Sequence, residues 1–595
     1  MRTIEAPLRT IETDVLVVGA GPAGLTAAAL LAEYGVDAIT VTKYPGTANS
    51  PRAHITNQRT MEVFRDLGIE DRVCAVATPN ELMGSNVWAT SFAGPELARL
   101  MTWGSGIARK ADYEAASPTA MCNIPQHLLE PVLAEAANER NADVRFSTEL
   151  VSITQDDERV HAVVRERTTG TEYGIDARYV IGADGGRSTV AEQLGFPFEG
   201  ESGLGAAVNV WLEADLTAYT AHRPGTLYWM CQPGNDYWVG SGTFICVRPW
   251  NEWVMLFMYD PAGGEPDLSE AAVTERAHTL IGDAGVDVRI KGVSQWQINH
   301  VVATEYRRGR AFLAGDAAHR HPPANGLGTN TSVQDAYNLA WKLAAVLDGR
   351  AGEALLDTYH DERQPVGKQV VDRAMKSVAD MLPISQALGF AAGQSADEGW
   401  AELDTLFGDS PDGARRRAEL AEAVALQNHQ FNCHGVELDQ HYASAAVVPD
   451  GSAAPEPERD PELYHHPSTR PGDHLPHAWL QHGTARVSTL DLTGHGRFTL
   501  LAGIGGQAWA DAAAKVAADL GVDLAVRRVG HRQEHDDVCG DWDRLRGVGD
   551  RGALLVRPDR HVAWRAADLP GDPEQALGAA VRRVLALDPA PQESR

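Results

Sequence analysis

A short apolar run, a cluster of glycines and an alanine-rich run follow one another between Asp14 and Gly35, as DVLVVGAGPAGLTAAALLAEYG. Gly19, Gly21 and Gly24 stand at the spacing GxGxxG. In a βαβ unit the first glycine of this spacing allows a tight turn, the second lets backbone approach a pyrophosphate, and the third lets helix and strand pack closely. The amino end of the helix then faces the phosphates. We expect dinucleotide contacts from Gly19, Gly21, Pro22, Ala23 and Gly24.

The next apolar run, DAITVTK at residues 37–43, completes this unit as a second strand. A ribose-binding acid normally stands at the end of that strand. Here Thr42 and Lys43 stand in its place, and a threonine hydroxyl can still bond to a ribose. We therefore keep Thr42 and Lys43 as expected cofactor contacts.

Two further segments have the form of a strand followed by a turn. RYVIGADGGRSTVAEQLG (178–195) leads to Asp184, and RAFLAGDAAH (310–319) leads to Gly315-Asp316. Apolar residues at helical spacing follow the second turn and predict a helix. We expect Thr331 or Ser332 to cap this helix, with Asp335 in the place of a capping-box acid.

Asp316, His319 and His321 invite a metal hypothesis because an acid and two histidines stand close together. The two histidines lie two apart on a loop, and no third ligand of the usual kind is evident. A metal would also leave the prolines and glycines of HPPANGLG unexplained. We predict no metal site and treat both histidines as scaffold beside a cofactor.

The ordered series GxGxxG, Asp-Gly and Gly-Asp resembles the group A flavoprotein aromatic hydroxylases, and YHDERQPVGKQVV (359–371) matches a later stretch of that family. SPRAHITNQRTMEVFRDLGIED (50–71), CNIPQHLLEPVL (122–133) and HRHPPANGLGTNTSVQDAYNLAWKL (319–343) are similar to its phenol hydroxylase branch. The resemblance covers nearly the whole chain. It implies an α/β fold in which a GxGxxG-type, Rossmann-like FAD-binding domain is interleaved with an antiparallel-sheet substrate domain, followed by a thioredoxin-like C-terminal domain.

The resemblance and the local patterns together predict the domain boundaries. The FAD-binding domain is expected at 1–85, 120–200 and 300–380, the substrate domain at 86–119 and 201–299, a helical segment at 381–446, a linker at 447–475, and the thioredoxin-like domain at 476–595. Strand and helix patterns between RFTLLAGIGG (497–506) and GALLVRPDRHVAWRA (552–566) support the last of these. Its CxxC motif is missing, so we expect packing rather than redox chemistry from it.

The resemblance also assigns cofactor contacts residue by residue. Arg52 is expected on the pyrophosphate, Gln126 near the ribityl chain and Asp316 on a ribityl hydroxyl. Asp184 matches the element tied to FAD and nicotinamide, although Asp184 and Arg187 could instead form a local salt bridge. Backbone along the isoalloxazine is expected from Pro323, Gly326, Gly328, Thr329 and Asn330, with the amino end of the next helix near the electron-poor edge of the flavin.

His54 is the expected catalytic residue, because a phenol reacts better as phenolate and histidine is suited to accept its proton. A purely structural role for His54 is an equal alternative at this point. The segment at 227–260 alternates aromatic and β-branched residues and predicts an antiparallel sheet. Among its aromatic residues, Trp229, Trp238, Phe244 and Trp250, we select Trp229 and Trp238, with Pro323, as substrate contacts.

The implied reaction is hydroxylation of an aromatic ring ortho or para to a hydroxyl group. NADH or NADPH would reduce FAD and leave, since no second GxGxxG follows a strand, and dioxygen would add at flavin C4a. The substrate could be a catabolic phenol, or a polyketide aromatic or hydroxypyridine of the piericidin type in natural-product tailoring. A halogenase is disfavoured because RPWNEWVM lacks W-x-W-x-I-P. A Baeyer–Villiger oxygenase and a flavin-binding protein without turnover stay open.

Composition limits the partners. The formal net charge of −29 disfavours nucleic acid and anionic membranes, which require clustered basic residues. No apolar run approaches the length of a membrane helix, and the first residues carry no signal-peptide pattern. Six scattered cysteines fit a reducing compartment. We expect a cytoplasmic homodimer or higher homo-oligomer that acts on a small aromatic substrate and O2.

Overall fold

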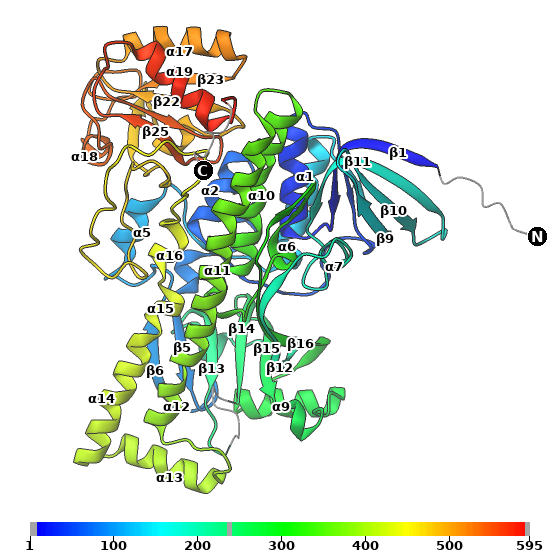
Figure 1. Ribbon diagram of the computed structural model, residues 1–595. Coiled ribbons are helices and arrows are strands. Elements are labelled where there is room, and N and C mark those ends of the chain that lie inside the picture. The colour runs from blue at the N-terminus through cyan, green and yellow to red at the C-terminus, as the bar shows by residue number, and fades with distance from the viewer. Residues whose placement is uncertain (1–8, 235–240, 589–595) are drawn as a thin grey trace, which may run out of the picture.

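Strand β1 (Thr10–Val18) lies inside an eight-stranded sheet and carries the first glycine turn at its carboxyl end. The structure is a computed structural model, and it describes residues 9–234 and 241–588 (Figure 1). The strand order is β17-β18-β11-β1-β2-β8, and β10 and β9 extend the sheet from β11. The other strands are β2 (Ala38–Val41), β8 (Asp143–Arg145), β9 (Thr148–Gln155), β10 (Val160–Glu166), β11 (Glu172–Gly182), β17 (Arg307–Arg308) and β18 (Ala311–Leu313).

The three strand–turn elements predicted from the sequence come together in this sheet. β1 pairs in parallel with β2 and β11, and β11 pairs in parallel with β18. Because parallel strands end at the same edge, their turns meet there. Helices α1 (Pro22–Glu33), α6 (Gln126–Glu139) and α10 (Gly328–Leu347) pack together beside the sheet. Small residues on α1 let these helices approach closely, and Ala27, Ala28 and Ala29 are all buried.

A second eight-stranded sheet has the order β19-β16-β12-β15-β14-β13-β5-β6. Its strands are β5 (Ser85–Ala89), β6 (Glu96–Met101), β12 (Phe198–Glu213), β13 (Gly225–Met230), β14 (Gly242–Arg248), β15 (Glu252–Tyr259), β16 (Arg289–Ala303) and β19 (His319–Arg320). The expected antiparallel pairing of β13, β14 and β15 is confirmed. β13 and β5 instead pair in parallel, because β5 arrives from an earlier excursion of the chain and no hairpin links the two. Helix α9 (Glu270–Ile281) covers one face of this sheet.

Helices connect these sheets with the C-terminal third. The long helix α11 (Asp357–Asp380) leads into the helices α12 (Leu382–Leu388), α13 (Ala396–Phe407), α14 (Pro411–Leu426), α15 (Asn428–Phe431) and α16 (His434–Leu438). Residues 447–475 contain no helix or strand, in line with the predicted loop. The other short elements are α2 (Gln58–Asp66), α3 (Glu70–Val76), α4 (Asn80–Met83), α5 (Lys110–Ala116), α7 (Thr189–Gln193), α8 (Thr217–Thr220), β3 (Ile55–Thr56), β4 (Thr78–Pro79) and β7 (Cys122–Asn123).

The C-terminal third forms a separate four-stranded sheet in the order β23-β22-β24-β25. β22 and β23 are parallel and joined by a helix, whereas β24 and β25 are antiparallel and followed by a helix. This is the order and direction of a thioredoxin-like unit, as predicted. Its elements are β20 (Trp479–His482), β21 (Ala485–Ser488), β22 (Phe498–Ala502), α17 (Gln507–Leu520), β23 (Leu524–Arg528), α18 (Asp541–Leu545), β24 (Ala553–Val556), β25 (Val562–Ala566) and α19 (Pro573–Val584).

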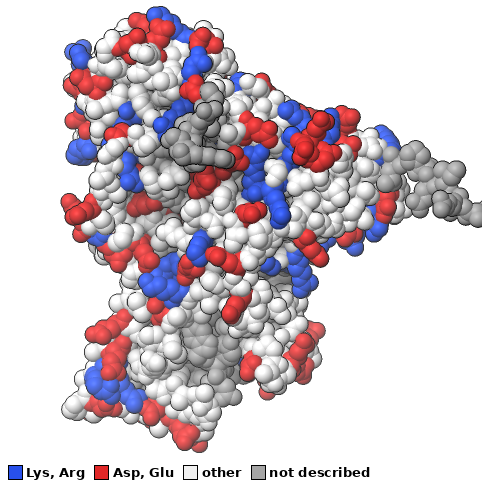
Figure 2. Space-filling model, in the orientation of Figure 1, with Lys and Arg blue, Asp and Glu red and all other residues white. Residues whose placement is uncertain are grey.

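Acidic and basic side chains are interspersed over the face of the molecule shown in Figure 2. The acidic excess is therefore not gathered there into one large patch of a single sign. Among the described residues, none of the helices combines the length and the hydropathy needed to cross a bilayer.

Candidate active site

The glycine turn between β1 and α1 has the close contacts that its spacing requires. Gly19 has φ +108°, and a Cβ there would lie 2.1 Å from the carbonyl oxygen of Ala183. A Cβ at Gly24 would lie 1.9 Å from the carbonyl oxygen of Gly19. At Gly21 the nearest protein atom to an added Cβ is Glu130 Oε1, at 3.9 Å. The first and third glycines thus serve packing, and the second leaves space on the side where a pyrophosphate is expected.

Helix α1 begins directly at this space. Gly21 is the N-cap residue, Pro22 follows it, and no side chain caps the helix. The first N–H groups of a helix have no partner within the helix, so those of Ala23 and Gly24 are available to an anion. The predicted contacts at the first turn therefore lie together.

Thr42 and Lys43 lie at the carboxyl end of β2. The Thr42 backbone is tied to the neighbouring strands, with its N–H donating to the Arg145 carbonyl at 3.0 Å. Thr42 is buried, whereas Lys43 is exposed and its Nζ lies 5.6 Å from the centre of the Tyr44 ring. A threonine hydroxyl and an ammonium group thus stand where an acid is usual.

Arg52 and Gln126 meet beside the same turn. The Gln126 backbone N–H donates to the Arg52 carbonyl at 2.8 Å. The Arg52 guanidinium is exposed, and its positive charge acts to lower the pKa of both Glu130 and Asp316. Those two carboxyl groups, from α6 and from the turn after β18, therefore lie around Arg52.

Glu130 was missed in the sequence analysis. Its carboxylate accepts hydrogen bonds from the Ala48 backbone N–H and from Gln126 Nε2, and its side chain faces Gly21. Burial raises the pKa of Glu130 above its usual value, and the hydrogen bonds and Arg52 only partly oppose this. The sequence held one signal, because Glu130 is four residues after Gln126 and therefore on the same face of the helix.

The Asp316 side chain is accessible to solvent, yet many protein groups surround its carboxyl group. Burial raises the pKa of its carboxyl group, and His319, Arg320 and Arg52 oppose this rise. A carboxylate that lines a hollow in the protein surface would be both accessible to solvent and raised in pKa. The preceding Gly315 has φ +62°, and a Cβ there would lie 2.7 Å from Ser332 Oγ and 3.3 Å from Ala23 Cβ. The Gly-Asp turn is thus pressed against α10 and against the first glycine turn.

Asp184 has a local role that neither expectation anticipated. Its carboxylate accepts hydrogen bonds from Ser188 Oγ at 2.5 Å and from the backbone N–H groups of Thr189 at 2.7 Å and Val190 at 3.2 Å. It therefore holds the first turn of α7. Arg187 is exposed, and the salt bridges of the described residues include none between Arg187 and Asp184. The alternative of a local salt bridge is wrong.

Helix α10 begins at Gly328, earlier than predicted, and no side chain caps it. The expected cap at Thr331 or Ser332 is wrong, because both hydroxyls bond backward within the helix, to the carbonyls of Leu327 and Gly328 at 2.9 Å each. Asp335 is not a capping-box acid but a fully buried ion-pair partner of His319 and Arg363. The uncapped amino end leaves the N–H groups of Gly328, Thr329 and Asn330 free of helical partners.

The loop before α10 is fixed by close contacts. Gly326 has φ +65°, and a Cβ there would lie 2.8 Å from Ile55 Cβ. Asn330 Nδ2 donates to the carbonyl oxygens of Ile55 at 2.9 Å and Gly326 at 2.7 Å. The Asn330 side chain is thus fully engaged with protein, and only its backbone remains for a cofactor. Pro323 is exposed at the start of this loop.

The His54 carbonyl accepts the Ile124 N–H at 2.7 Å, just before α6, and the next residue, Ile55, contacts the loop at Gly326. Burial, with a smaller effect of the charge on His127, lowers the pKa of His54 to about 3. Its Nδ1 is buried and has no hydrogen-bond partner within the protein. The imidazole is therefore neutral near neutral pH and able to accept or donate a hydrogen bond to a bound molecule.

Trp229 lies on the face of the second sheet that points toward Ile55. It packs against an apolar cluster that includes Ile55, Met83, Trp88 and Trp103, and its ring stacks on Trp88 at 6.5 Å. Its indole Nε1 is buried without a partner. Phe244 and Trp250, which were not selected as substrate contacts, pack in the opposite cluster, under α9. Trp238 lies outside the described residues.

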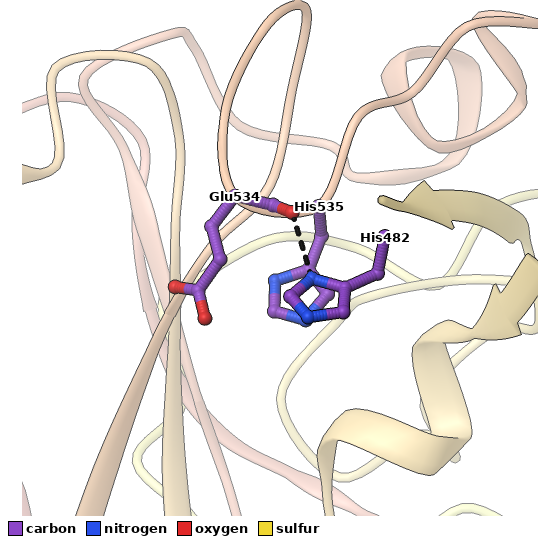
Figure 3. A group of neighbouring side chains, drawn as sticks. All are labelled: His482, Glu534 and His535. Carbon is purple, nitrogen blue, oxygen red and sulfur yellow. Dashed lines mark hydrogen bonds between the residues drawn. The ribbon is translucent and has the colours of Figure 1, made fainter. Parts of the chain in front are cut away.

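The histidines of the central motif are held by protein oxygen atoms. His319 Nε2 lies 2.9 Å from Asp335 Oδ2, and His321 Nδ1 lies 2.7 Å from the Pro322 carbonyl. Within the described residues, the group with metal-ligand spacing is His482, Glu534 and His535, in the C-terminal third (Figure 3). The two imidazoles stack at 4.9 Å with planes 20° apart. Imidazole lone pairs lie in the ring plane, so nearly parallel rings do not aim them at one ion.

Comparison with known proteins agrees with this geometry. Residues 12–374 match the family model of the FAD binding domain, and residues 468–587 match that of the aromatic-ring hydroxylase C-terminal domain. The open space at Gly21, the exposed Asp316 and the uncapped α10 fit a bound FAD. The chain therefore belongs to the FAD-dependent aromatic-ring hydroxylases. It is an FAD-dependent monooxygenase, with NAD(P)H as the electron donor typical of the family.

The relatives cover nearly the full chain. 2,4-Dichlorophenol 6-monooxygenase of Delftia acidovorans is 50% identical over 578 residues, which cover 97% of this chain and 99% of that protein. Phenol 2-monooxygenase of a Pseudomonas strain is 47% identical over 570 residues, which cover 95% of this chain and 92% of that protein. The solved structure of the flavin-dependent monooxygenase PieE in complex with FAD and substrate has a TM-score of 0.94 and 50% identity. The match covers 97% of this chain and 100% of that one.

Proposed function

We propose that this enzyme hydroxylates the ring of a phenol or a hydroxy-heteroaromatic compound, ortho or para to its hydroxyl group, and consumes NAD(P)H and O2. The observation that carries the proposal is the place of His54. The Nδ1 atom of His54 is buried and has no hydrogen-bond partner. The next residue in the sequence, Ile55, contacts both the loop before α10 and the aromatic cluster of Trp229. A neutral hydrogen-bonding group thus stands beside a residue that contacts both the cofactor loop and an apolar cluster.

In this proposal bound FAD supplies the electron transfer and the activation of oxygen. The first glycine turn and Arg52 bind the pyrophosphate, Thr42 and Lys43 face the adenosine ribose, and Gln126 and Asp316 hold the ribityl chain. Asp184 positions its turn through α7. The backbone of Pro323, Gly326, Gly328, Thr329 and Asn330 lies along the flavin, where the uncapped amino end of α10 stabilises negative charge.

His54 acts on the substrate hydroxyl in this proposal. A neutral imidazole accepts a hydrogen bond from a phenol and so increases the electron density of the ring. Trp229 and Pro323 contact the ring, and Trp238, which lies outside the described residues, remains a predicted contact. The apolar surroundings exclude water, which limits the release of activated oxygen as hydrogen peroxide before it reaches the substrate.

The names of the relatives suggest two substrate classes. Relatives named for chlorophenol and phenol suggest a catabolic phenol. Relatives named for tetracenomycin and for polyketides suggest natural-product tailoring of a polyketide aromatic or a hydroxypyridine. We also propose the domain boundaries given above and a homodimer or higher homo-oligomer.

The test is the oxidation of NADH and of NADPH by purified enzyme, with and without a panel of phenols, polyketide aromatics and hydroxypyridines. The proposal expects at least one compound to accelerate oxidation and to gain one oxygen on its ring. Oxygen inserted into a ring C–C bond would indicate a Baeyer–Villiger reaction instead. A protein that binds FAD but oxidises neither nicotinamide with any compound would contradict the proposal.

A further inference from the structure

A buried chain of polar contacts links the Gly315–Asp316 turn to the C-terminal third. It begins at Asp335 on α10, whose Oδ2 accepts the Gly315 backbone N–H at 3.0 Å and lies 2.9 Å from His319 Nε2. Its Oδ1 accepts from Arg363 Nε at 2.8 Å. The Asp335 and Arg363 side chains have no exposed area. One carboxylate therefore fixes the backbone immediately before Asp316.

Arg363 extends this chain away from the cofactor. Its Nη1 donates to Gln440 Oε1 at 2.7 Å and to Tyr442 Oη at 2.9 Å. The Tyr442 ring stacks on His561 at 3.9 Å with planes 18° apart. His561 lies between β24 and β25 of the C-terminal sheet. The contacts thus run from the thioredoxin-like unit, through residues 440–442, to the turn that presents Asp316.

We propose that Asp335 and Arg363 are positioning residues, and that through them the C-terminal domain braces the Gly315–Asp316 turn in its FAD-binding conformation. This assigns a role to a domain that lacks the cysteine pair for redox chemistry. The proposal rests on the proposed contact of Asp316 with the cofactor. A buried charge that loses its partner forces its surroundings to rearrange, so a change at Arg363 is transmitted to the Gly315 N–H.

A second buried ion pair across the same interface provides a matched control. Arg560 Nη2 lies 3.0 Å from Asp66 Oδ1, and Arg560 Nη1 donates to the Glu62 carbonyl at 2.7 Å. The Arg560 and Asp66 side chains are 1% and 2% exposed. This pair joins the C-terminal domain to α2, and Asp66 also accepts from Tyr337 Oη on α10 at 2.9 Å. Among the described residues, none of its hydrogen bonds reaches the turn at Gly315. It separates a general loss of domain packing from a specific loss at the cofactor.

The experiment compares full-length Arg363→Lys, Tyr442→Phe, Arg560→Lys and Asp316→Asn. The FAD dissociation constant of each apoprotein is measured by flavin fluorescence, and its melting temperature is measured without FAD. We expect Arg363→Lys to weaken FAD about ten-fold and the milder Tyr442→Phe about three-fold, the effects of lost hydrogen bonds to a charged group. Arg560→Lys should lower the melting temperature by a similar amount and change FAD affinity less than about two-fold.

Two results would overturn the brace. The first is a loss of FAD affinity that follows the melting temperature equally in Arg363→Lys and Arg560→Lys, since the contacts would then be only structural. The second is unchanged affinity in both Arg363→Lys and Tyr442→Phe while Asp316→Asn binds FAD poorly, which would leave the Asp316 contact standing alone. Unchanged affinity in Asp316→Asn would instead refute the proposed cofactor contact, and the brace as stated with it.

Discussion

Asn330 on α10 bonds to the residue that precedes and caps α2: Asn330 Oδ1 accepts the backbone N–H of Asn57 at 3.0 Å. The Asn57 side chain in turn accepts the Thr60 backbone N–H at 3.0 Å and caps α2. Asn330 Nδ2 bonds to Ile55 and Gly326 as described above. One amide thus joins the cofactor loop, the strand beside His54 and the start of α2.

Replacing Asn330 with alanine should therefore lower the free energy of unfolding by roughly 3 kcal/mol, since buried donors and acceptors lose their partner together. Asn299→Ala is the control, because Asn299 makes only partly exposed contacts at the edge of the second sheet. Urea denaturation of both variants measures the effect. Equal stability losses would contradict the special place of Asn330.

The space at Gly21 leads to a prediction about FAD binding. Gly21→Ala should leave the melting temperature of the apoprotein unchanged, because no protein atom lies within 3.9 Å of the new Cβ. FAD should bind about ten-fold or more weakly, because the methyl group occupies the place of the pyrophosphate. Gly263→Ala, at a remote and open position, is the control for titration of the apoprotein with FAD. Normal affinity in Gly21→Ala would contradict the assigned phosphate position.

His54 should affect the rate without shaping its pH dependence. Its pKa is lowered to about 3 by burial, so the imidazole stays neutral across the working range. We expect His54→Asn to reduce kcat about 100-fold while the pH profile of kcat/KM between about pH 5 and 8 keeps its shape. His300→Asn, at a partly exposed histidine paired with Asp372, is the control. An acid limb present in the wild type and absent in His54→Asn would show that His54 titrates.

Trp229 should act on substrate binding rather than on folding. Trp229→Phe keeps a ring beside Trp88 but removes the unpartnered indole N–H. We expect KM for the aromatic substrate to rise about five-fold, the worth of one hydrogen bond, with little change in melting temperature. Steady-state kinetics measures this against Trp400→Phe at an exposed tryptophan. A variant with wild-type KM would remove Trp229 from the substrate contacts.

Acid should destabilise the C-terminal third through His477. Burial lowers the pKa of this histidine from 6.5 to about 4. The folded state then binds fewer protons than the unfolded state between these values, so stability is full above about pH 6.5 and is lost as the pH falls toward 4. At about pH 5 the free energy of unfolding should be lower by roughly 2 kcal/mol than above about pH 6.5. Urea unfolding measures the free energy of unfolding of the wild type and of His477→Asn above about pH 6.5 and at about pH 5. The drop between the two pH values should be smaller in His477→Asn by roughly 2 kcal/mol. An equal drop in the two proteins would contradict the lowered pKa of His477.

The sequence was most informative where function depends on local backbone. The three strand–turn units and the glycine-rich approach to α10 follow from residues that are neighbours in the chain. The helix start was wrong by one turn because Thr331 and Ser332 can bond to the backbone either forward, as a cap, or backward, as they do here. An alternating strand does not reveal which of its faces a helix covers, so the side on which Phe244 packs, under α9, could not be predicted.

The long-range polar network could not be predicted. Asp335 was predicted as a capping-box acid and Glu130 was not singled out. Their roles depend on partners brought near by the fold, such as Arg363 and the Ala48 N–H. Burial of a charged group is decided by the whole packing rather than by local pattern. The C-terminal third was predicted as a fold, whereas its contacts with the turn at Gly315 appear only in three dimensions.

The most direct test of ring hydroxylation follows the oxygen atom. Enzyme, FAD, NAD(P)H and a stimulating hydroxyaromatic compound are incubated under 18O2, and the product is analysed by mass spectrometry. We expect a ring-hydroxylated product that carries one 18O atom, and no label in the product when the 18O is supplied as water. A product labelled only from water, or release of all the oxygen as hydrogen peroxide with every compound that accelerates NAD(P)H oxidation, would contradict a ring-hydroxylating monooxygenase.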